Sequence, residues 1–131
     1  MDPDRPRLSE VARQLSTLPR PARMALYAVA TAVLLYMGLA PTRDLPGVGL
    51  FWDKWEHLVA WFILTLLGFL LSPRRPRAIV AFAVGLGAGI ELLQATMGFG
   101  RQGDILDLIA DSLGVFAAIT VTLIARSLPR R

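Results

Sequence analysis

Long uncharged runs of apolar residues dominate the chain and predict helices that cross a membrane. Residues 24–40 carry no charge, and residues 78–100 are interrupted only by Glu91. An α-helix needs about 20 mainly apolar residues to cross the hydrocarbon core of a bilayer, so both runs qualify. Two more runs, 58–72 and 112–125, reach that length only by extending backwards into polar residues. The pattern therefore predicts four spans, at about residues 24–40, 53–72, 78–98 and 105–125.

The segment before the first span has the pattern of a short amphipathic helix. Its apolar residues recur at helical spacing: Leu8, Val11, Leu15 and Leu18. Arg13 and Gln14 fall on another face, so this helix is expected to lie on the membrane surface. The predicted fold class is all-α, a four-helix transmembrane bundle preceded by an interfacial helix. The predicted divisions are an N-terminal segment, a single transmembrane domain and a tail, at residues 1–23, 24–126 and 127–131.

The distribution of basic residues predicts how the bundle is oriented. Eleven of the 14 Lys and Arg residues lie in three segments, 5–23, 74–77 and 126–131, which four spans place on one side. Loops rich in Lys and Arg stay in the cytoplasm, so we expect both termini to be cytoplasmic. A cleaved signal peptide is the alternative for the first span, since Gly38 and Ala40 are small residues near its end, but Pro41 directly after them disfavours cleavage.

Composition agrees with a membrane protein and narrows the possible chemistry. Of the 131 residues, 54% are apolar and 18% are charged, and the mean hydropathy is +0.52. Soluble domains have about 45–50% apolar and about 25% charged residues. The absence of cysteine excludes disulfides, thiolate metal sites and a cysteine nucleophile. Nucleic acid is not an expected partner, because the arginines behind the basic pI flank the spans.

Glu91 is the most informative polar residue because it lies inside the third span. It is about seven residues from the outer end of that span, which puts it roughly 10 Å below the surface. A carboxylate at that depth is unfavourable unless it is protonated, paired or facing a wet cavity, so it is a functional candidate. Gln94 is three residues further on and shares its face. A packing hydrogen bond inside the bundle is the alternative for both residues.

Two further polar segments open the second and fourth spans. In Asp53-Lys54-x-x-His57, Asp53 and His57 are four residues apart and share a helix face. The fourth span opens on carboxylates spaced three and four apart: Asp104, Asp107 and Asp111. Asp53 and Asp104 have the alternative of capping a helix N-terminus. All of these residues fall in the same half of the membrane as Glu91, so the sequence predicts one polar site there.

The predicted site has more carboxylates than cations, and this excess requires compensation. Protonation of some carboxylates, a bound cation or a cationic ligand would supply it. An unperturbed His57 titrates near neutral pH, so it is a candidate proton acceptor, metal ligand or hydrogen-bond donor. We expect no metal cofactor, because the H-E-x-x-H spacing is absent. A hard divalent cation is the alternative that an oxygen-rich site favours.

Small and aromatic residues predict how the spans pack. Glycines occur in the third and fourth spans: Gly85, Gly87, Gly89 and Gly114. Gly85-x-x-x-Gly89 has the spacing that lets two transmembrane helices approach closely. Trp52 and Trp55 are expected at the membrane interface, whereas Trp61 lies deeper and is expected to pack inside the bundle.

Three blocks of the sequence resemble the VanZ-like family of small bacterial membrane proteins. They are Asp53-Lys54-x-x-His57, Gly89-Ile90-Glu91-Leu92-Leu93-Gln94 and Arg101-x-x-Asp104-x-x-Asp107-x-x-x-Asp111-Ser112-x-Gly114. The family often has Asn-Thr in place of Asp111-Ser112, and tyrosine in place of Trp61. The resemblance implies a bacterial cytoplasmic membrane and a site formed by the matched polar residues. The family's founding member is associated with teicoplanin resistance, so the resemblance implies a context of glycopeptide response and no particular reaction.

These residues leave several functions open. The first is a non-enzymatic protein that binds a lipid-linked cell-wall intermediate or a lipidated antibiotic, with carboxylates on its hydroxyl or amine groups. Lys54, His57 and Arg101 would then meet an anionic head. The second is an intramembrane hydrolase or transferase, with Glu91 or His57 as general base, Arg101 as electrostatic stabiliser and Asp107 as a candidate nucleophile. Proton-coupled transport and structural assembly are further alternatives. Four short spans would make a small transporter, so transport would require a homo-oligomer.

Overall fold

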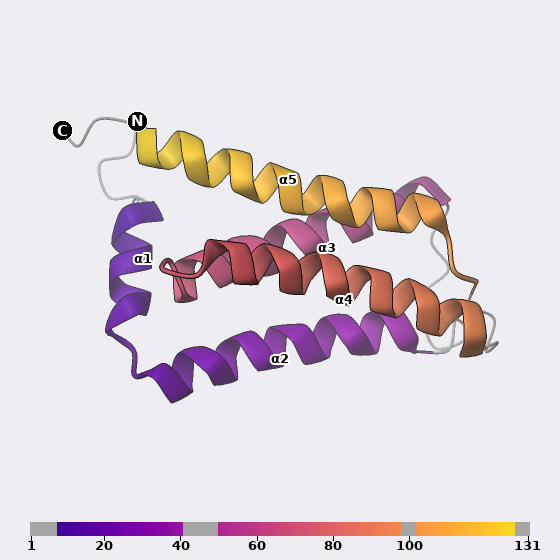
Figure 1. Ribbon diagram of the computed structural model, residues 1–131, viewed down its shortest axis with the longest axis horizontal. Helices are drawn as coiled ribbons and strands as arrows, with labels where there is room; N and C mark the ends of the chain where they lie inside the picture. The colour runs from indigo at the N-terminus through magenta and orange to yellow at the C-terminus, as the bar shows by residue number, and fades with distance from the viewer. Residues whose placement is uncertain (1–7, 41–49, 98–101, 128–131) are drawn as a thin grey trace.

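The fold is an all-helical bundle, seen in a computed structural model that describes residues 8–40, 50–97 and 102–127 (Figure 1). The helices are α1 (Leu8–Thr17), α2 (Arg20–Leu39), α3 (Leu50–Leu71), α4 (Pro76–Met97) and α5 (Ile105–Ser127). Helices α2 to α5 run side by side, and α1 lies across one end of them. No strand occurs in these described ranges, so the predicted fold class is confirmed.

Four helices are long and apolar enough to cross a membrane, which confirms the predicted number of spans. They cover Arg20–Leu39, Lys54–Leu71, Pro76–Met97 and Ile105–Ser127. The first of the spanning helices, α2, begins at Arg20, four residues earlier than predicted. Pro21 lies in its first turn, where a helix leaves backbone N–H groups unbonded and proline loses nothing. Many large apolar side chains point outwards, and α2 has no fully buried residue, as a helix facing lipid requires.

Helix α1 has the amphipathic character that its sequence predicts. It packs against α3, and Val11, Leu15 and Leu18 are partly buried. Arg13 and Gln14 are exposed. The helix therefore lies across the long helices instead of adding a fifth parallel one, an orientation that suits a membrane surface.

The core lies where α3, α4 and α5 meet. Its buried members are Trp61, Ala83, Ile90 and Val115. Helices α3 and α5 make the most extensive contact in the bundle. Gly114 permits it, because a Cβ there would collide with the carbonyl oxygen of Leu58 and lie 2.9 Å from the amide nitrogen of Phe62. This close approach aligns the polar faces of the two helices.

The packing prediction for Gly85-x-x-x-Gly89 is wrong within the described chain. A Cβ added at Gly85 or Gly89 would meet no atom within 4 Å. Gly87, between them, faces the interior and is buried. Of the four predicted glycines, Gly87 and Gly114 are the ones that contact a neighbouring helix. Gly87 is two residues from both Gly85 and Gly89, so it lies on about the opposite face of α4.

Candidate functional site

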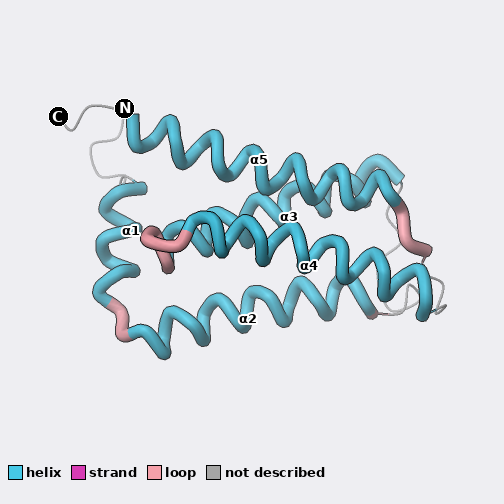
Figure 2. The backbone as a smooth tube through the Cα atoms, in the orientation of Figure 1, coloured by secondary structure: helices cyan, strands magenta, loops and turns pink. Residues whose placement is uncertain are grey.

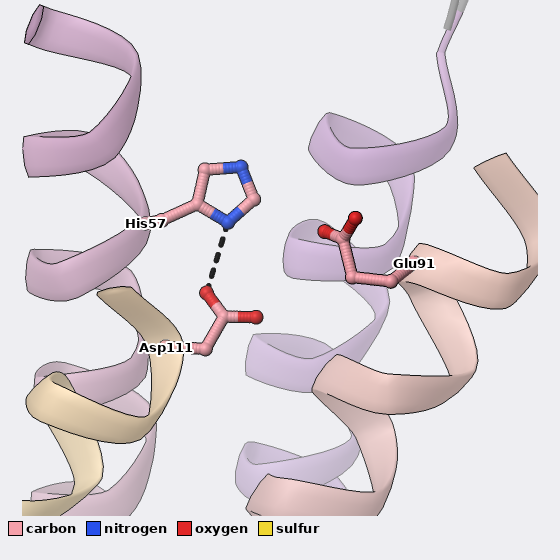
Figure 3. Close-up of side chains that lie close together, drawn as sticks. All are labelled: His57, Glu91 and Asp111. Atoms are coloured by element: carbon pink, nitrogen blue, oxygen red, sulfur yellow. Dashed lines mark hydrogen bonds and ion pairs between the residues drawn. The ribbon is translucent and has the colours of Figure 1, made fainter. Parts of the chain in front are cut away.

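Three helices each contribute one side chain to a polar cluster in the half of the bundle where α3 and α5 begin. Figure 3 shows these side chains. His57 comes from α3, Glu91 from α4 and Asp111 from α5, and the three side chains point towards one another. The Nδ1 atom of His57 lies 2.9 Å from the Oδ1 atom of Asp111, a hydrogen-bonding distance. One ligand atom from each residue lies within 4.8 Å of the other two. The structure thus brings together residues that are far apart in the sequence.

Lys54 connects α3 to the start of α5. Its ammonium donates a hydrogen bond to Oδ2 of Asp104 at 2.6 Å and another to Oδ1 of Asp107. Asp107 also lies close to the next polar residue of α3, with 3.8 Å between its Oδ2 atom and Nε2 of His57. The polar stripe of α3 therefore faces the acidic stripe of α5 along its length, as residues three and four apart on a helix allow.

Asp104 caps the N-terminus of α5 as well as pairing with Lys54. Its Oδ1 atom accepts a hydrogen bond of 2.8 Å from the backbone N–H of Leu106. The predicted capping alternative for Asp104 is therefore confirmed. The hydrogen bond from the Lys54 ammonium, followed by the bond from Leu106, lowers the pKa of Asp104 from its ordinary value. This carboxyl is therefore ionised at neutral pH, and the positive end of the helix dipole stabilises its negative charge.

Glu91 holds the start of α5 against α4 with only one of its two oxygens. Its Oε2 atom accepts a hydrogen bond of 2.7 Å from the backbone N–H of Asp104. Its Oε1 atom is buried and has no hydrogen-bond partner among the described residues. The side chain is therefore positioned by one oxygen and leaves the other available in the cluster.

Asp111 has the same division between a bonded and an unbonded oxygen. Oδ1 contacts His57, whereas Oδ2 is buried without a partner in the part of the chain that is described. Gly87 makes room for Oδ2, since a Cβ at this position would lie 2.8 Å from it. Buried hydrogen-bond acceptors in native proteins almost always have a donor. Two buried oxygens without a donor in one cluster therefore indicate a place where a hydrogen-bond donor can bind.

Trp61 fixes the orientation of His57. The two rings stack with 5.8 Å between their centroids and 14° between their planes. The indole Nε1–H of Trp61 donates a hydrogen bond of 3.0 Å to the carbonyl oxygen of Ala83 in α4. Trp61 is 2% exposed, which confirms its predicted place inside the bundle, while Trp55 is exposed.

Gln94 shares a helix face with Glu91 but makes a packing contact. Its side-chain amide donates a hydrogen bond of 2.6 Å to the carbonyl oxygen of Gly38 in α2. This is the interhelical bond that the sequence offered as the alternative to a functional role. Gln94 therefore ties α2 to α4 next to the cluster.

The cluster continues to the protein surface through side chains of increasing exposure. Asp111 is 2% exposed and His57 12%, whereas Lys54 reaches 21% and Asp104 35%. This gradient forms a polar track from the end of the bundle to the buried oxygens. Two predicted site residues are not part of this description. The side chain of Asp53 and the whole of Arg101 lie outside the described residues, so the predictions about them stay predictions.

Sequence reasoning missed the particular contribution of Gly87, which it treated only as a packing residue. The available signal was its position four residues before Glu91, which puts both residues on one face of α4. It also missed that the indole of Trp61 bonds to Ala83, because helix pairing across the bundle is not visible in the sequence.

Comparisons with known proteins give one match, to a family model. The family model described as VanZ/LLP1 matches residues 15–126, which include the cluster and all four spans except Ser127, the last residue of the fourth. No curated protein sequence and no solved structure matches the chain.

Proposed function

Because the chain belongs to the VanZ/LLP1 family and has four helices suited to crossing a membrane, we propose that it binds a cell-envelope ligand through the His57–Glu91–Asp111 cluster. The proposed ligand is an amphiphile with a hydroxyl or amine group for the carboxylates and an apolar chain for the lipid-facing helix surface. A lipid-linked cell-wall intermediate and a lipidated glycopeptide such as teicoplanin both have this chemistry. In this proposal the protein is not an enzyme and contributes to glycopeptide resistance by binding.

The observation that carries the proposal is the pair of buried, unbonded oxygens, Oε1 of Glu91 and Oδ2 of Asp111. A buried acceptor without a donor is unfavourable by roughly 1–3 kcal/mol, so a ligand that donates to both atoms gains binding free energy there. An ammonium group suits them best, because it offers several N–H donors and a positive charge. In the free protein, protonation of a carboxylate would relieve the same excess of negative charge.

Lys54 has a supporting part in this proposal. From the sequence, its charge is expected to meet an anionic head of the ligand, but the ammonium is paired with Asp104 and Asp107. We therefore propose that Lys54 holds the acidic face of α5 against α3 and that the ligand's donor groups contact Glu91 and Asp111.

We propose that the cluster lies in the outer leaflet of the bacterial cytoplasmic membrane, with both termini in the cytoplasm. Support comes from the arginines at the opposite end of the bundle, where α1 and the α3–α4 loop lie (Figure 2). Segments rich in Lys and Arg remain on the cytoplasmic side. This orientation would give an extracellular or lipid-linked ligand direct access to the polar track.

The test is teicoplanin binding to the purified protein and to two matched variants. Glu91→Gln keeps the shape of the side chain but removes its charge, and we expect it to weaken binding at least about tenfold, as loss of a charged hydrogen bond does. Glu56→Gln removes a carboxylate that is exposed on α3 and should change binding less than twofold. Equal affinity of the native protein and Glu91→Gln would refute the proposed site.

The same variants test resistance in a teicoplanin-sensitive host. Cells with the native protein or Glu56→Gln should survive higher antibiotic concentrations than cells with empty vector, whereas Glu91→Gln at equal membrane abundance should not protect. If Glu91→Gln loses binding but neither the native protein nor Glu56→Gln protects the cells, the binding proposal stands and the resistance role is wrong.

A divalent cation is the second candidate occupant of the cluster. The observation that favours it is the 4.8 Å limit on the separation of the three ligand atoms. One imidazole nitrogen and two carboxylate oxygens form a mixed donor set that suits zinc or manganese better than calcium. Elemental analysis of protein purified without chelators would give about one ion per chain, and Glu91→Gln would lose it. Native protein free of metal that still binds teicoplanin would exclude this candidate.

A further inference from the structure

A second candidate site lies at the other end of the bundle, away from the acidic cluster. It is a groove of about 1000 Å³ with walls formed by α2 and α4 and a floor that includes Gly68 and Leu71 of α3. Residues 72–75 of the α3–α4 loop line one end of the groove. This loop lies next to α1 (Figure 2). Gly68 is eleven residues from His57 on the same helix, or about 16 Å along its axis. The groove is therefore separate from the site of the proposed function.

Two segments that are distant in the sequence place arginines around this groove. Arg20 and Arg23 come from the start of α2, and Arg74 and Arg75 come from the α3–α4 loop. None of the described residues that line the groove is acidic. Arg20, Arg74 and Arg75 are exposed at its rim. The positive charge at the rim therefore has no compensating carboxylate among the groove-lining residues described.

Two buried donors extend this positive region into the groove. Arg23 donates from Nη1 to the carbonyl oxygen of Leu71 at 2.9 Å, but its Nε atom is buried and has no partner among the described residues. The hydroxyl of Tyr27 is also buried and unbonded there. Tyr27 is four residues after Arg23, so both side chains lie on one face of α2. Two unbonded donors beside three rim arginines indicate an anion as the occupant.

The shape of the groove beyond these donors fits an apolar chain. The ring of Tyr27 packs at a tilt against Phe82, with 5.7 Å between the ring centroids. Gly68 allows this position, because a Cβ there would lie 3.2 Å from Cε2 of Tyr27. Further along α2, the groove is lined by the exposed Ala28 and Ala32 and by the partly buried Leu35. A ligand with its anionic head at the rim would thus place an attached apolar chain in the groove.

We propose that this groove binds an anionic glycerophospholipid. Its phosphate lies among Arg23, Tyr27 and the rim arginines, and one acyl chain lies along α2 and α4. Orientation by basic loops explains why arginines flank the spans. Orientation does not require arginines from two distant segments to surround one groove, and it does not require a buried tyrosine hydroxyl inside that groove. Arginine is well matched to a phosphate because its planar guanidinium donates two parallel hydrogen bonds.

The test is lipid retention measured by native mass spectrometry of the full chain in neutral detergent. Equimolar phosphatidylglycerol and phosphatidylcholine are added, and the native protein should retain mainly phosphatidylglycerol. An arginine near a membrane surface contributes enough that each one lost should weaken this binding about fivefold. The double variant Arg74→Gln/Arg75→Gln should therefore bind about 25-fold more weakly. Both residues are exposed, so the variant is expected to fold.

Two single variants sharpen the result. Tyr27→Phe removes only the buried hydroxyl and should weaken phosphatidylglycerol binding about tenfold, as loss of a hydrogen bond to a charged group does. Arg13→Gln removes an exposed arginine of α1 that does not line the groove, and should change binding less than twofold. An excess of inorganic phosphate should not displace the lipid, because phosphate lacks the acyl chain.

Three outcomes would overturn the proposal. Equal retention of the two lipids by the native protein would show that the groove does not select an anion. A loss of about fivefold in Arg13→Gln, which equals the loss per arginine in the double variant, would show that only net charge matters. Displacement of the lipid by inorganic phosphate would identify a free anion as the occupant. None of these outcomes bears on teicoplanin binding at Glu91, so the two proposals can fail separately.

Discussion

Gly87 and Asp111 face each other across the contact of α4 and α5, with so little room that a Cβ on Gly87 would lie 2.8 Å from Oδ2 of Asp111. The oxygen that Gly87 accommodates is one of the two buried acceptors of the candidate site. The same Cβ would lie 3.2 Å from the indole nitrogen of Trp61. The absence of a side chain at Gly87 therefore permits the Asp111 carboxylate to lie beside His57.

Gly87→Ala should displace the Asp111 carboxylate and weaken its hydrogen bond to His57. We expect a change in the ¹⁵N chemical shift of Nδ1 of His57 and at least about a tenfold loss of teicoplanin binding, as for loss of a charged hydrogen bond. Gly85→Ala is the matched control, because a Cβ there meets no atom within 4 Å. A Gly87→Ala protein with the native His57 spectrum and native binding would contradict the assigned role of Gly87.

Gln94→Leu should separate packing from binding. The substitution keeps the side chain's size but removes the hydrogen bond to Gly38 that joins α4 to α2. Interhelical hydrogen bonds in membranes contribute about 0.6–2 kcal/mol, so the free energy of unfolding should fall by that amount. Unfolding in mixed micelles measures this change. Teicoplanin affinity should stay within twofold of the native value, and a tenfold loss would instead show that Gln94 contacts the ligand.

Trp61→Phe should loosen both the His57 ring and the α3–α4 contact. It removes the indole N–H that donates to Ala83, and we expect the free energy of unfolding to fall by about 1–2 kcal/mol. The exposed Trp55 provides the control, since Trp55→Phe should change stability by less than about 0.5 kcal/mol. Equal stability of the two variants would mean that the indole bond does not hold the helices together.

Asp104→Asn should make the protein less sensitive to acid. The Lys54 ammonium, then the Leu106 amide, lowers the pKa of Asp104 below its ordinary value of 3.8. As the pH falls, the carboxyl of the unfolded chain binds its proton first, so the stability contributed at neutral pH is lost between 3.8 and the lowered pKa. Thermal unfolding below about pH 5 should therefore show a shallower loss in Asp104→Asn than in the native protein or Glu56→Gln. An equally steep loss in all three proteins would contradict the pairing with Lys54.

The sequence alone determined the spans and the amphipathic α1, and it predicted the residues of a polar site. Hydropathy and helical spacing are local properties, so the uncharged runs predict where helices cross the membrane. The spacing of His57 and of the three aspartates predicts which carboxylates share a face. A buried Glu91 follows from its place within a long apolar run, because the position of a residue along a span gives its depth.

Which of these residues meet, and how each oxygen is used, depends on how the helices pack in three dimensions. Gly87, not Gly85 or Gly89, faces α5, and Gln94 bonds to Gly38 instead of joining the cluster. The unbonded atoms of Glu91 and Asp111 likewise depend on the rotation and axial position of α4 and α5. These quantities are set by side chains interlocking across helices distant in the sequence, so no local pattern contains them.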